Sequence, residues 1–359
     1  MNTSTSITLD ATAKASALRL LNPWQRDFPM VSRPFEYIGQ ALHMTEAQVI
    51  TQLHALQNAG ALSRIGGVFA AHAGGAALLA AMAVPAQRLD AVAAAVSSHP
   101  GVNHNYEREH TYNLWFVLTA PSEHDLAQAL HSIQLRTGLH ALALRMRKAY
   151  RIDLGFDLQH PLATPRGVAT PLATVLSASK VLNSPKPSTP NAAIAKEDMP
   201  LAALVEAGLP LVAQPFAVWA QTLGWAETQV LDRLQQWLTQ GLLRRFGVIV
   251  RHHELGFDAN AMTVFNVPDD HVDACGAMLA SCPEVTLAYQ RKRAPQWPYN
   301  LYCMVHGRDR ATVLAHIERL TQHCGLGQMP REILFSRRRF KQIGARRFRA
   351  MDSSEGVPC

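Results

Sequence analysis

Residues 28–49 read FPMVSRPFEYIGQALHMTEAQV, and residues 209–230 read LPLVAQPFAVWAQTLGWAETQV. The two stretches align without a gap at an offset of 181 residues, and the same register continues through matched glycines, arginines and histidines. Further on, HNYEREHTYNLW (104–115) is echoed by the longer LAYQRKRAPQWPYNLY (287–302). A repeat of this length predicts two copies of one fold in a single chain, so function is expected where the copies differ in polar residues.

The bulk composition is that of an ordinary globular chain. Its 359 residues, of which 48% are hydrophobic, predict two to three domains with cores of their own. The sequence has neither an apolar run of the ~20 residues that span a bilayer nor the basic and then apolar N-terminus of a secretory signal. We therefore expect a cytoplasmic protein that does not enter a membrane.

Charge and cysteine usage narrow the possible ligands. The net charge of +7 predicts an anionic partner, which leaves nucleic acid, a membrane surface or a polycarboxylate open. Eight of the Lys and Arg residues lie in 331–349 beside a single acid, Glu332, although such a run is also compatible with a merely solvated face. The five cysteines all fall in the second copy without a CxxC pair, so we expect neither a disulfide framework nor a resident metal site.

Each copy divides into two parts with different periodicity. Helical segments come first, and in the first copy Thr45 is expected to cap a helix that ends near Gly60. Two short strands (ALSRI and GGVFAA) follow, a pattern typical of a winged helix-turn-helix. The rest of each copy reads as βαββαβ, the ferredoxin-like order. The sequence thus predicts an α+β fold, a tandem duplication that packs as a pseudo-dimer.

The expected boundaries follow the repeat. The predicted segments are a disordered N-terminus (1–14), winged helix-turn-helix 1 (15–73), ferredoxin-like domain 1 (74–158), a Pro/Ser/Ala-rich linker (159–199), winged helix-turn-helix 2 (200–256) and ferredoxin-like domain 2 with its basic tail (257–350).

This domain order resembles the Lrp/AsnC transcription regulators, which makes DNA binding the first hypothesis to weigh. Recognition helices need Lys or Arg to neutralise phosphates and to read base edges. The first copy has none between Arg33 and Arg64, and the second has only Arg233 between Lys196 and Arg244. The sequence therefore argues against a DNA-reading helix.

Polar residues concentrate instead on the ferredoxin-like hairpins. Side chains at alternate positions of a strand share a face, so His104, Tyr106 and Arg108 are expected to point the same way. That face of a ferredoxin-like sheet is expected to be open to a ligand, and guanidiniums beside aromatic rings suit a flat polyanion. Packing roles for Tyr106, Tyr289 and Trp115, and an interior structural role for His104, are compatible with the same pattern.

At these hairpins the sequence resembles the siroheme decarboxylases, an Lrp/AsnC-like family. NHNYEREHTYNLWFV in the first half is similar to the D-type subunit, and WPYNLYCMVHGRDR with LFSRRRFKQIGAR in the second half is similar to the L-type subunit. The resemblance covers nearly the whole chain apart from the N-terminus and linker. It implies a fusion of two subunits that converts siroheme to 12,18-didecarboxysiroheme, with loss of two CO2 from acetate groups, in haem d1 biosynthesis.

The resemblance also implies roles for individual residues. No cofactor is required, because iron belongs to the siroheme substrate, and further homologous subunits or a homo-oligomer are possible partners. The residues expected to be catalytic are His104 as proton donor or orienting group, with Tyr106 or Tyr289 in support. Those expected to bind substrate are Arg108, His110, Tyr112, Asn113, Trp115, Arg291, Arg293, Trp297, Tyr299, Asn300, Arg338 and Lys341.

One departure from the family pattern bears on the number of active sites. Leu287 stands where several family members carry a second histidine. The two halves are then expected to have unequal roles, with one competent site near the pseudo-dimer interface. Two alternatives stay open at this point. One is an Lrp/AsnC-type regulator or effector sensor, and the other is a subunit that is inactive without homologous partners.

Overall fold

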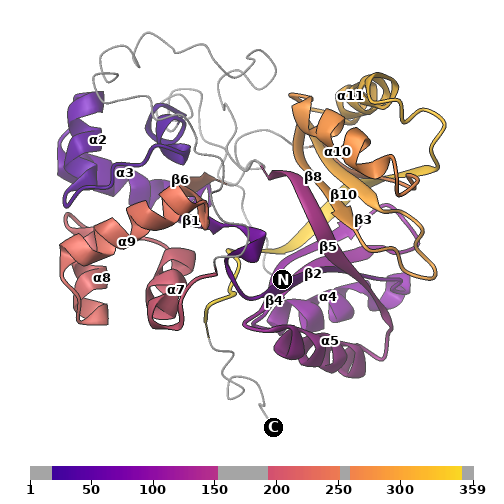
Figure 1. The fold of residues 1–359 in the computed structure, drawn as a ribbon, viewed down its shortest axis with the longest axis horizontal. Coiled ribbons are helices and arrows are strands. Elements are labelled where there is room, and N and C mark those ends of the chain that lie inside the picture. The colour runs from indigo at the N-terminus through magenta and orange to yellow at the C-terminus, as the bar shows by residue number, and fades with distance from the viewer. Residues whose placement is uncertain (1–17, 153–192, 251–258, 350–359) are drawn as a thin grey trace. The chain divides into compact units, whose positions relative to one another are not determined.

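The computed structural model describes residues 18–152, 193–250 and 259–349, which form two compact units (Figure 1). Among the described residues, one unit comprises 18–73 with 193–250, and the other 74–152 with 259–349. Each unit therefore takes one part from each copy of the repeat. The predicted N-terminal disordered segment and nearly all of the predicted linker lie outside the described residues.

The helices of the first unit follow the repeat. They are α2 (Pro34–Leu42), α3 (Glu46–Asn58), α7 (Met199–Ala207), α8 (Pro215–Leu223) and α9 (Glu227–Gln240). Thr45 caps α3 as predicted, because its Oγ1 accepts from the Gln48 N–H at 3.2 Å while Gln48 Oε1 accepts from the Thr45 N–H at 2.9 Å. In the second copy Ala226 has no side-chain oxygen, so only the return bond from its N–H to Gln229 Oε1 is present, at 2.8 Å.

The predicted two-stranded wing in each copy is wrong. Each copy contributes one strand, and β1 (Leu62–Phe69) pairs antiparallel with β6 (Leu243–Val250) of the other copy. Gly66 lies opposite Gly247 at the centre. A Cβ on Gly66 would lie 2.7 Å from the Val205 carbonyl oxygen, so only glycine admits α7 at this distance. The two copies thus share one ribbon.

The second unit contains two βαββαβ copies, as predicted. The first consists of β2 (Ala76–Met82), α4 (Leu89–Ser98), β3 (Val102–Arg108), β4 (Leu114–Ala120), α5 (Glu123–Thr137) and β5 (Ala141–Ile152). The second consists of β7 (Ala259–Phe265), α10 (Val272–Ser281), β8 (Val285–Arg291), β9 (Leu301–Gly307), α11 (Arg310–His323) and β10 (Arg331–Gln342).

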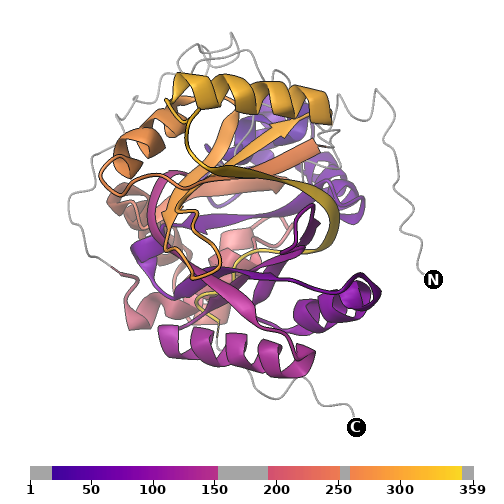
Figure 2. The same cartoon turned by 90° about the vertical axis from the view of Figure 1, so that its right-hand side faces the viewer.

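The two sheets close into one barrel in the order β10-β3-β4-β2-β5-β8-β9-β7. The last strand of each copy makes the closure, since it pairs with its own copy through its first half and with the other copy through its second half. The first half of β10 pairs with β7 and its second half with β3, while β5 pairs likewise with β2 and then β8. Figure 2 shows the strands between the helices of the first copy and those of the second.

Alternation along the strands separates three hydrophobic cores. One lies under α4 and α5 and another under α10 and α11, as Val96 and Ile317 illustrate. The third fills the barrel interior and includes Trp115, Leu144 and Tyr302. The sheet face that we expected to be open is therefore the inside of the barrel. Among the described residues, none of the helices is both long and apolar enough to cross a membrane.

Candidate active site

His104, Tyr106 and Arg108 share the interior face of β3, as their alternation predicts. The His104 and Tyr106 rings are stacked with centroids 6.1 Å apart, and the Arg108 guanidinium lies 5.7 Å from the centre of the Tyr106 ring. Across the barrel, Arg291 lies 4.6 Å from the Tyr289 ring centre. The interior thus holds two Tyr–Arg pairs, one from each copy, and one of them has a histidine beside it.

The two arginines reach across the barrel in the same way. Arg108 Nη1 donates to the Leu334 carbonyl on β10 at 2.9 Å, and Arg291 Nη1 donates to the Leu144 carbonyl on β5 at 2.7 Å. Both side chains are buried, with relative exposures of 7% and 9%. Each guanidinium is therefore anchored by a backbone oxygen of the other copy, on the strand that pairs with both copies.

Neither guanidinium has a carboxylate partner among the acids that the structure describes. Burial lowers the pKa of Arg108 to about 10, which still leaves it protonated at neutral pH. Arg291 Nε is also buried without a hydrogen-bond acceptor. A buried charge that lacks a counter-ion is costly, and an anionic ligand would remove that cost.

An aromatic cluster joins the two hairpins. Trp297 is its centre, with ring centroids 5.2 Å from Trp115, 5.8 Å from Tyr112 and 4.9 Å from Tyr299. His110 packs edge-on against the same indole at 5.2 Å, and burial lowers the pKa of this imidazole. Trp297 and Trp115, both expected to bind substrate, are only 1% and 2% exposed, so in this structure they are core residues.

The longer loop of the second copy explains the position of Trp297. Ala294 and Trp297 exchange backbone hydrogen bonds of 3.0 and 2.8 Å, which turns the chain back on itself. The indole Nε1 then donates to Tyr302 Oη at 2.7 Å inside the barrel. The extra residues between Arg291 and Tyr299 therefore fill space between the copies, a role that their spacing does not reveal.

Asn113 and Asn300, predicted to bind substrate, have structural contacts instead. The Val84 N–H donates to Asn113 Oδ1 and Asn113 Nδ2 donates to the Val84 carbonyl, both at 2.9 Å. Asn300 makes the same two bonds with Val267, also at 2.9 Å. Each amide thus ties the start of a hairpin strand to the end of the first strand of its own copy.

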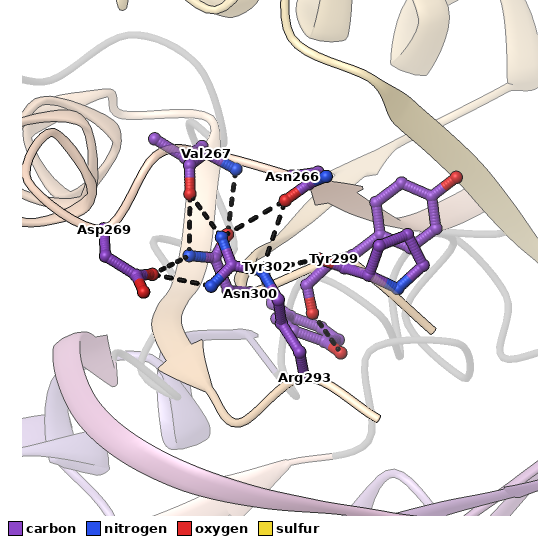
Figure 3. Close-up of polar contacts among 8 residues, drawn as sticks. Asn266, Val267, Asp269, Arg293, Tyr299, Asn300 and Tyr302 are labelled. Atoms are coloured by element: carbon purple, nitrogen blue, oxygen red, sulfur yellow. Dashed lines mark hydrogen bonds and ion pairs between the residues drawn. The ribbon is translucent and has the colours of Figure 1, made fainter. Parts of the chain in front are cut away.

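Arg293 is likewise engaged within the protein (Figure 3). Its guanidinium donates to Asp269 Oδ1 at 2.6 Å, to the Val267 carbonyl at 2.6 Å and to Asn266 Oδ1 at 3.2 Å. The charge and hydrogen bond of Arg293 lower the pKa of Asp269. These contacts hold the β8–β9 loop in place, so the predicted role of Arg293 as a carboxylate clamp is not supported by its geometry.

Arg338 and Lys341, which we expected to bind substrate, lie on the outer side of β10, where both contact other groups of the protein. Arg338 pairs with Glu107 at 3.1 Å and Asp90 at 2.6 Å, and Lys341 Nζ donates to the Ser97 carbonyl at 2.6 Å. Two irregularities in the β10–β3 register shift the alternation.

The same irregularities place two other residues on the inner face of β10. Arg339 lies opposite Tyr106, and Gln342 lies opposite His104. Sequence reasoning missed both residues, although comparison with β5 offers a signal: at the matched positions that strand carries Ala149 and Ile152.

Comparisons with known proteins show which family the domains of this chain match. A siroheme decarboxylase NirDL-like HTH domain matches residues 18–62 and 199–244, and an AsnC-like ligand binding domain matches residues 73–151 and 254–341. The siroheme decarboxylase NirDL subunit of Paracoccus pantotrophus is 41% identical over 330 residues, which cover 91% of this chain and 96% of the relative. The NirL subunit of Stutzerimonas stutzeri is 50% identical over 149 residues, which cover 41% of this chain and 88% of that subunit.

The solved structures agree as well. The siroheme decarboxylase NirDL in co-complex with an iron-uroporphyrin III analogue superimposes with a TM-score of 0.63 at 26% identity, covering 92% of this chain and 94% of that one. The shared domain order, the identity over almost the full length and the common fold lead to one conclusion: the chain belongs to the siroheme decarboxylase NirDL family.

Proposed function

We propose that this chain is a siroheme decarboxylase, a carboxy-lyase that converts siroheme to 12,18-didecarboxysiroheme in haem d1 biosynthesis. The observation that carries the proposal is the pair of buried cations, Arg108 and Arg291, which face the barrel interior without an acidic partner among the described residues. Siroheme carries eight carboxylates on a flat macrocycle. Guanidiniums bind carboxylates bidentately, and the neighbouring tyrosine rings suit the flat ring.

The reaction needs few protein groups. The acetate C–C bond breaks, its electron pair is delocalised into the macrocycle as CO2 leaves, and the methylene carbon then takes a proton to become methyl. Each decarboxylation thus consumes one proton and no electron, and the iron belongs to the substrate. His104 is the proposed proton donor, because an imidazole side chain can act as a general acid and this ring stacks on Tyr106 with centroids 6.1 Å apart. Tyr106 and Tyr289 are proposed to support it.

The binding contacts follow from position. Arg108 and Arg291 are proposed to hold carboxylates of the substrate in a fixed orientation, which lowers the entropic barrier to reaction. Tyr112, Tyr299 and His110 are half-buried members of the aromatic cluster. We propose that they contact the edge of the macrocycle, while Trp115 and Trp297 support them from the core.

We also propose that the helix-turn-helix unit does not bind DNA. Helix α3 carries no Lys or Arg. The single arginine of α9, Arg233, pairs with the buried carboxylate of Asp198 in the same unit. Phosphate contacts supply most of the affinity of DNA-binding proteins, and these helices offer few donors for them.

The direct test is anaerobic incubation of the purified chain with siroheme, followed by mass spectrometry of the extracted tetrapyrrole. Two successive mass losses, each equal to one CO2, would establish a self-sufficient decarboxylase. A change in the Soret band without any loss of mass would contradict self-sufficiency and point to a binding subunit that needs homologous partners. No change in mass or spectrum would overturn the proposal.

A further inference from the structure

The barrel has two equivalent seams where strands of different copies meet, and their residues differ. At the first seam β3 pairs with β10, so that Tyr106 faces Arg339 and His104 faces Gln342. At the second seam β8 pairs with β5, so that Tyr289 faces Ala149 and Leu287 faces Ile152. Residues directly opposite each other on antiparallel strands point to the same side of the sheet, here the barrel interior.

The first seam is therefore polar where the second is apolar. The duplication retains a tyrosine and a buried arginine in both copies. Only the first seam adds an imidazole, a guanidinium and an amide at matched positions. Arg339 Nη1 donates to Gln342 Oε1 at 3.2 Å, which connects the guanidinium to the position opposite His104. Both side chains are half-buried, so the polar groups lie at a protected edge of the interior.

We infer that the β3–β10 seam is the single site of decarboxylation and that Arg339, positioned by Gln342, binds a propionate of the substrate there. This inference rests on the proposed function and names residues of the same site. Each pyrrole ring of a uroporphyrinoid carries an acetate and a propionate on neighbouring carbons. A propionate held by Arg339 places the adjacent acetate toward His104, two residues along the facing strand from Tyr106.

The chemistry favours the propionate over the reacting acetate as the partner of Arg339. The acetate loses its negative charge as CO2 leaves, so an arginine bound to that carboxylate stabilises the ground state and opposes the reaction. An arginine on the neighbouring propionate orients the ring without this penalty. At the β8–β5 seam, Leu287, Ala149 and Ile152 offer apolar contacts to the rest of the macrocycle, beside the carboxylate contact proposed for Arg291.

A single site has a kinetic consequence. The two reacting acetates sit on different pyrrole rings, so both reach the β3–β10 seam only if the substrate is released or turned between the steps. The monodecarboxylated tetrapyrrole must therefore return to the same residues with its second acetate in place of the first. Any change at Arg339 should slow both steps together.

The test compares Arg339→Ala, which installs the residue of the second seam, with Arg337→Ala, which removes the same charge from an exposed neighbour paired with Glu109 at 3.5 Å. Anaerobic single-turnover assays on siroheme follow each CO2 loss by mass spectrometry. We expect both losses to slow by about 10-fold or more in Arg339→Ala, as for loss of a charge-assisted pair, and neither to change in Arg337→Ala. If one loss keeps the wild-type rate in Arg339→Ala, the second seam also reacts and the inference fails, while the proposed function stands.

Ligand titrations test the propionate assignment separately. Iron-coproporphyrin keeps the propionates of iron-uroporphyrin but has methyl groups in place of the acetates. Arg339→Ala should weaken both ligands by a similar factor, and an unchanged affinity for iron-coproporphyrin would overturn the assignment. Arg339→Lys and Gln342→Ile, each checked for a wild-type circular dichroism spectrum, repeat the measurements if the alanine variant does not fold. A wild-type chain that neither removes CO2 nor changes the Soret band of siroheme would instead reject the proposed function itself.

Discussion

Arg108 of the first copy donates to the backbone oxygen of Leu334 in the second copy at 2.9 Å. The bond satisfies one donor of a buried guanidinium, yet it supplies no opposite charge. Replacing a buried charged group by an apolar one of similar size is often neutral or stabilising. The two possible roles of Arg108 therefore predict opposite effects on stability. If the residue is structural, its replacement lowers the melting temperature; if it binds substrate, the melting temperature stays the same or rises.

We expect Arg108→Met to weaken the binding of iron-uroporphyrin by about 10-fold or more, while the melting temperature stays the same or rises. The reason is that the variant removes an anion-binding charge and also removes its desolvation cost. Soret titration and thermal unfolding measure the two effects. The matched control is Arg151→Met on the outer face of β5, whose Nη1 donates to the Cys282 carbonyl at 2.6 Å. A clear drop in melting temperature for Arg108→Met would contradict the view that Arg108 serves to bind an anionic ligand and does not stabilise the fold.

His104→Gln tests the proposed proton donor. Glutamine keeps a polar side chain at this position but cannot transfer a proton near neutral pH, so decarboxylation should slow by about 100-fold or more. The affinity for iron-uroporphyrin should change little, because the arginines remain. Mass spectrometry measures the rate and Soret titration measures the affinity. His124→Gln, an exposed histidine of α5, serves as the control. A normal rate in His104→Gln would remove this residue from the mechanism.

Asp269 predicts a pH dependence of stability. Arg293 lowers the pKa of the Asp269 carboxyl below its ordinary value of 3.8. The folded state then binds this proton less readily than the unfolded state. The stabilisation is consequently complete above about pH 4 and is lost as the pH falls through the lowered pKa of the folded state. The difference in melting temperature between the wild type and Asp269→Asn should be constant near neutral pH and vanish in acid. A difference that persists in acid would show that the ion pair is not its source.

The helix-turn-helix unit should lack measurable DNA affinity at physiological salt. Helices α3 and α9 offer only Arg233, which is paired with Asp198, so few counterions would be released on binding. Gel-shift assays over a series of salt concentrations measure this, with an Lrp/AsnC regulator as a positive control. Binding that weakens steeply with salt would contradict the expectation and revive a regulatory function.

The sequence predicted the local order of elements well because that order follows from periodicity. The alternation of His104, Tyr106 and Arg108 gave their common face correctly, since a regular strand has a period of two. Arg338 and Lys341 were expected to bind substrate without such a pattern, and irregular register in β10, which no residue type marks, places both on the outer face. The position of a β-bulge becomes known only when the pairing with the neighbouring strand is known.

Pairing between the copies was beyond prediction from local pattern. Strands β1 and β6 have the residue pattern of wing strands. Neither segment contains a local signal that shows whether its partner strand lies in the same copy or in the other. Trp297 posed a related problem, because a tryptophan in a polar loop reads equally well as a ligand contact or as a plug for the core. Its 1% exposure is decided by the packing of both hairpins together.

The double pairing of β5 and β10 has a consequence for assembly. Each of these strands extends the sheet of the other copy as well as its own, so the barrel requires one of each half. Separate polypeptides would have to sort themselves from like-with-like pairs, whereas covalent linkage keeps the correct mate at high effective concentration. Because the two halves no longer have to recognise copies of themselves, their residues can differ, as His104 of the first half and Leu287 of the second do at matched positions.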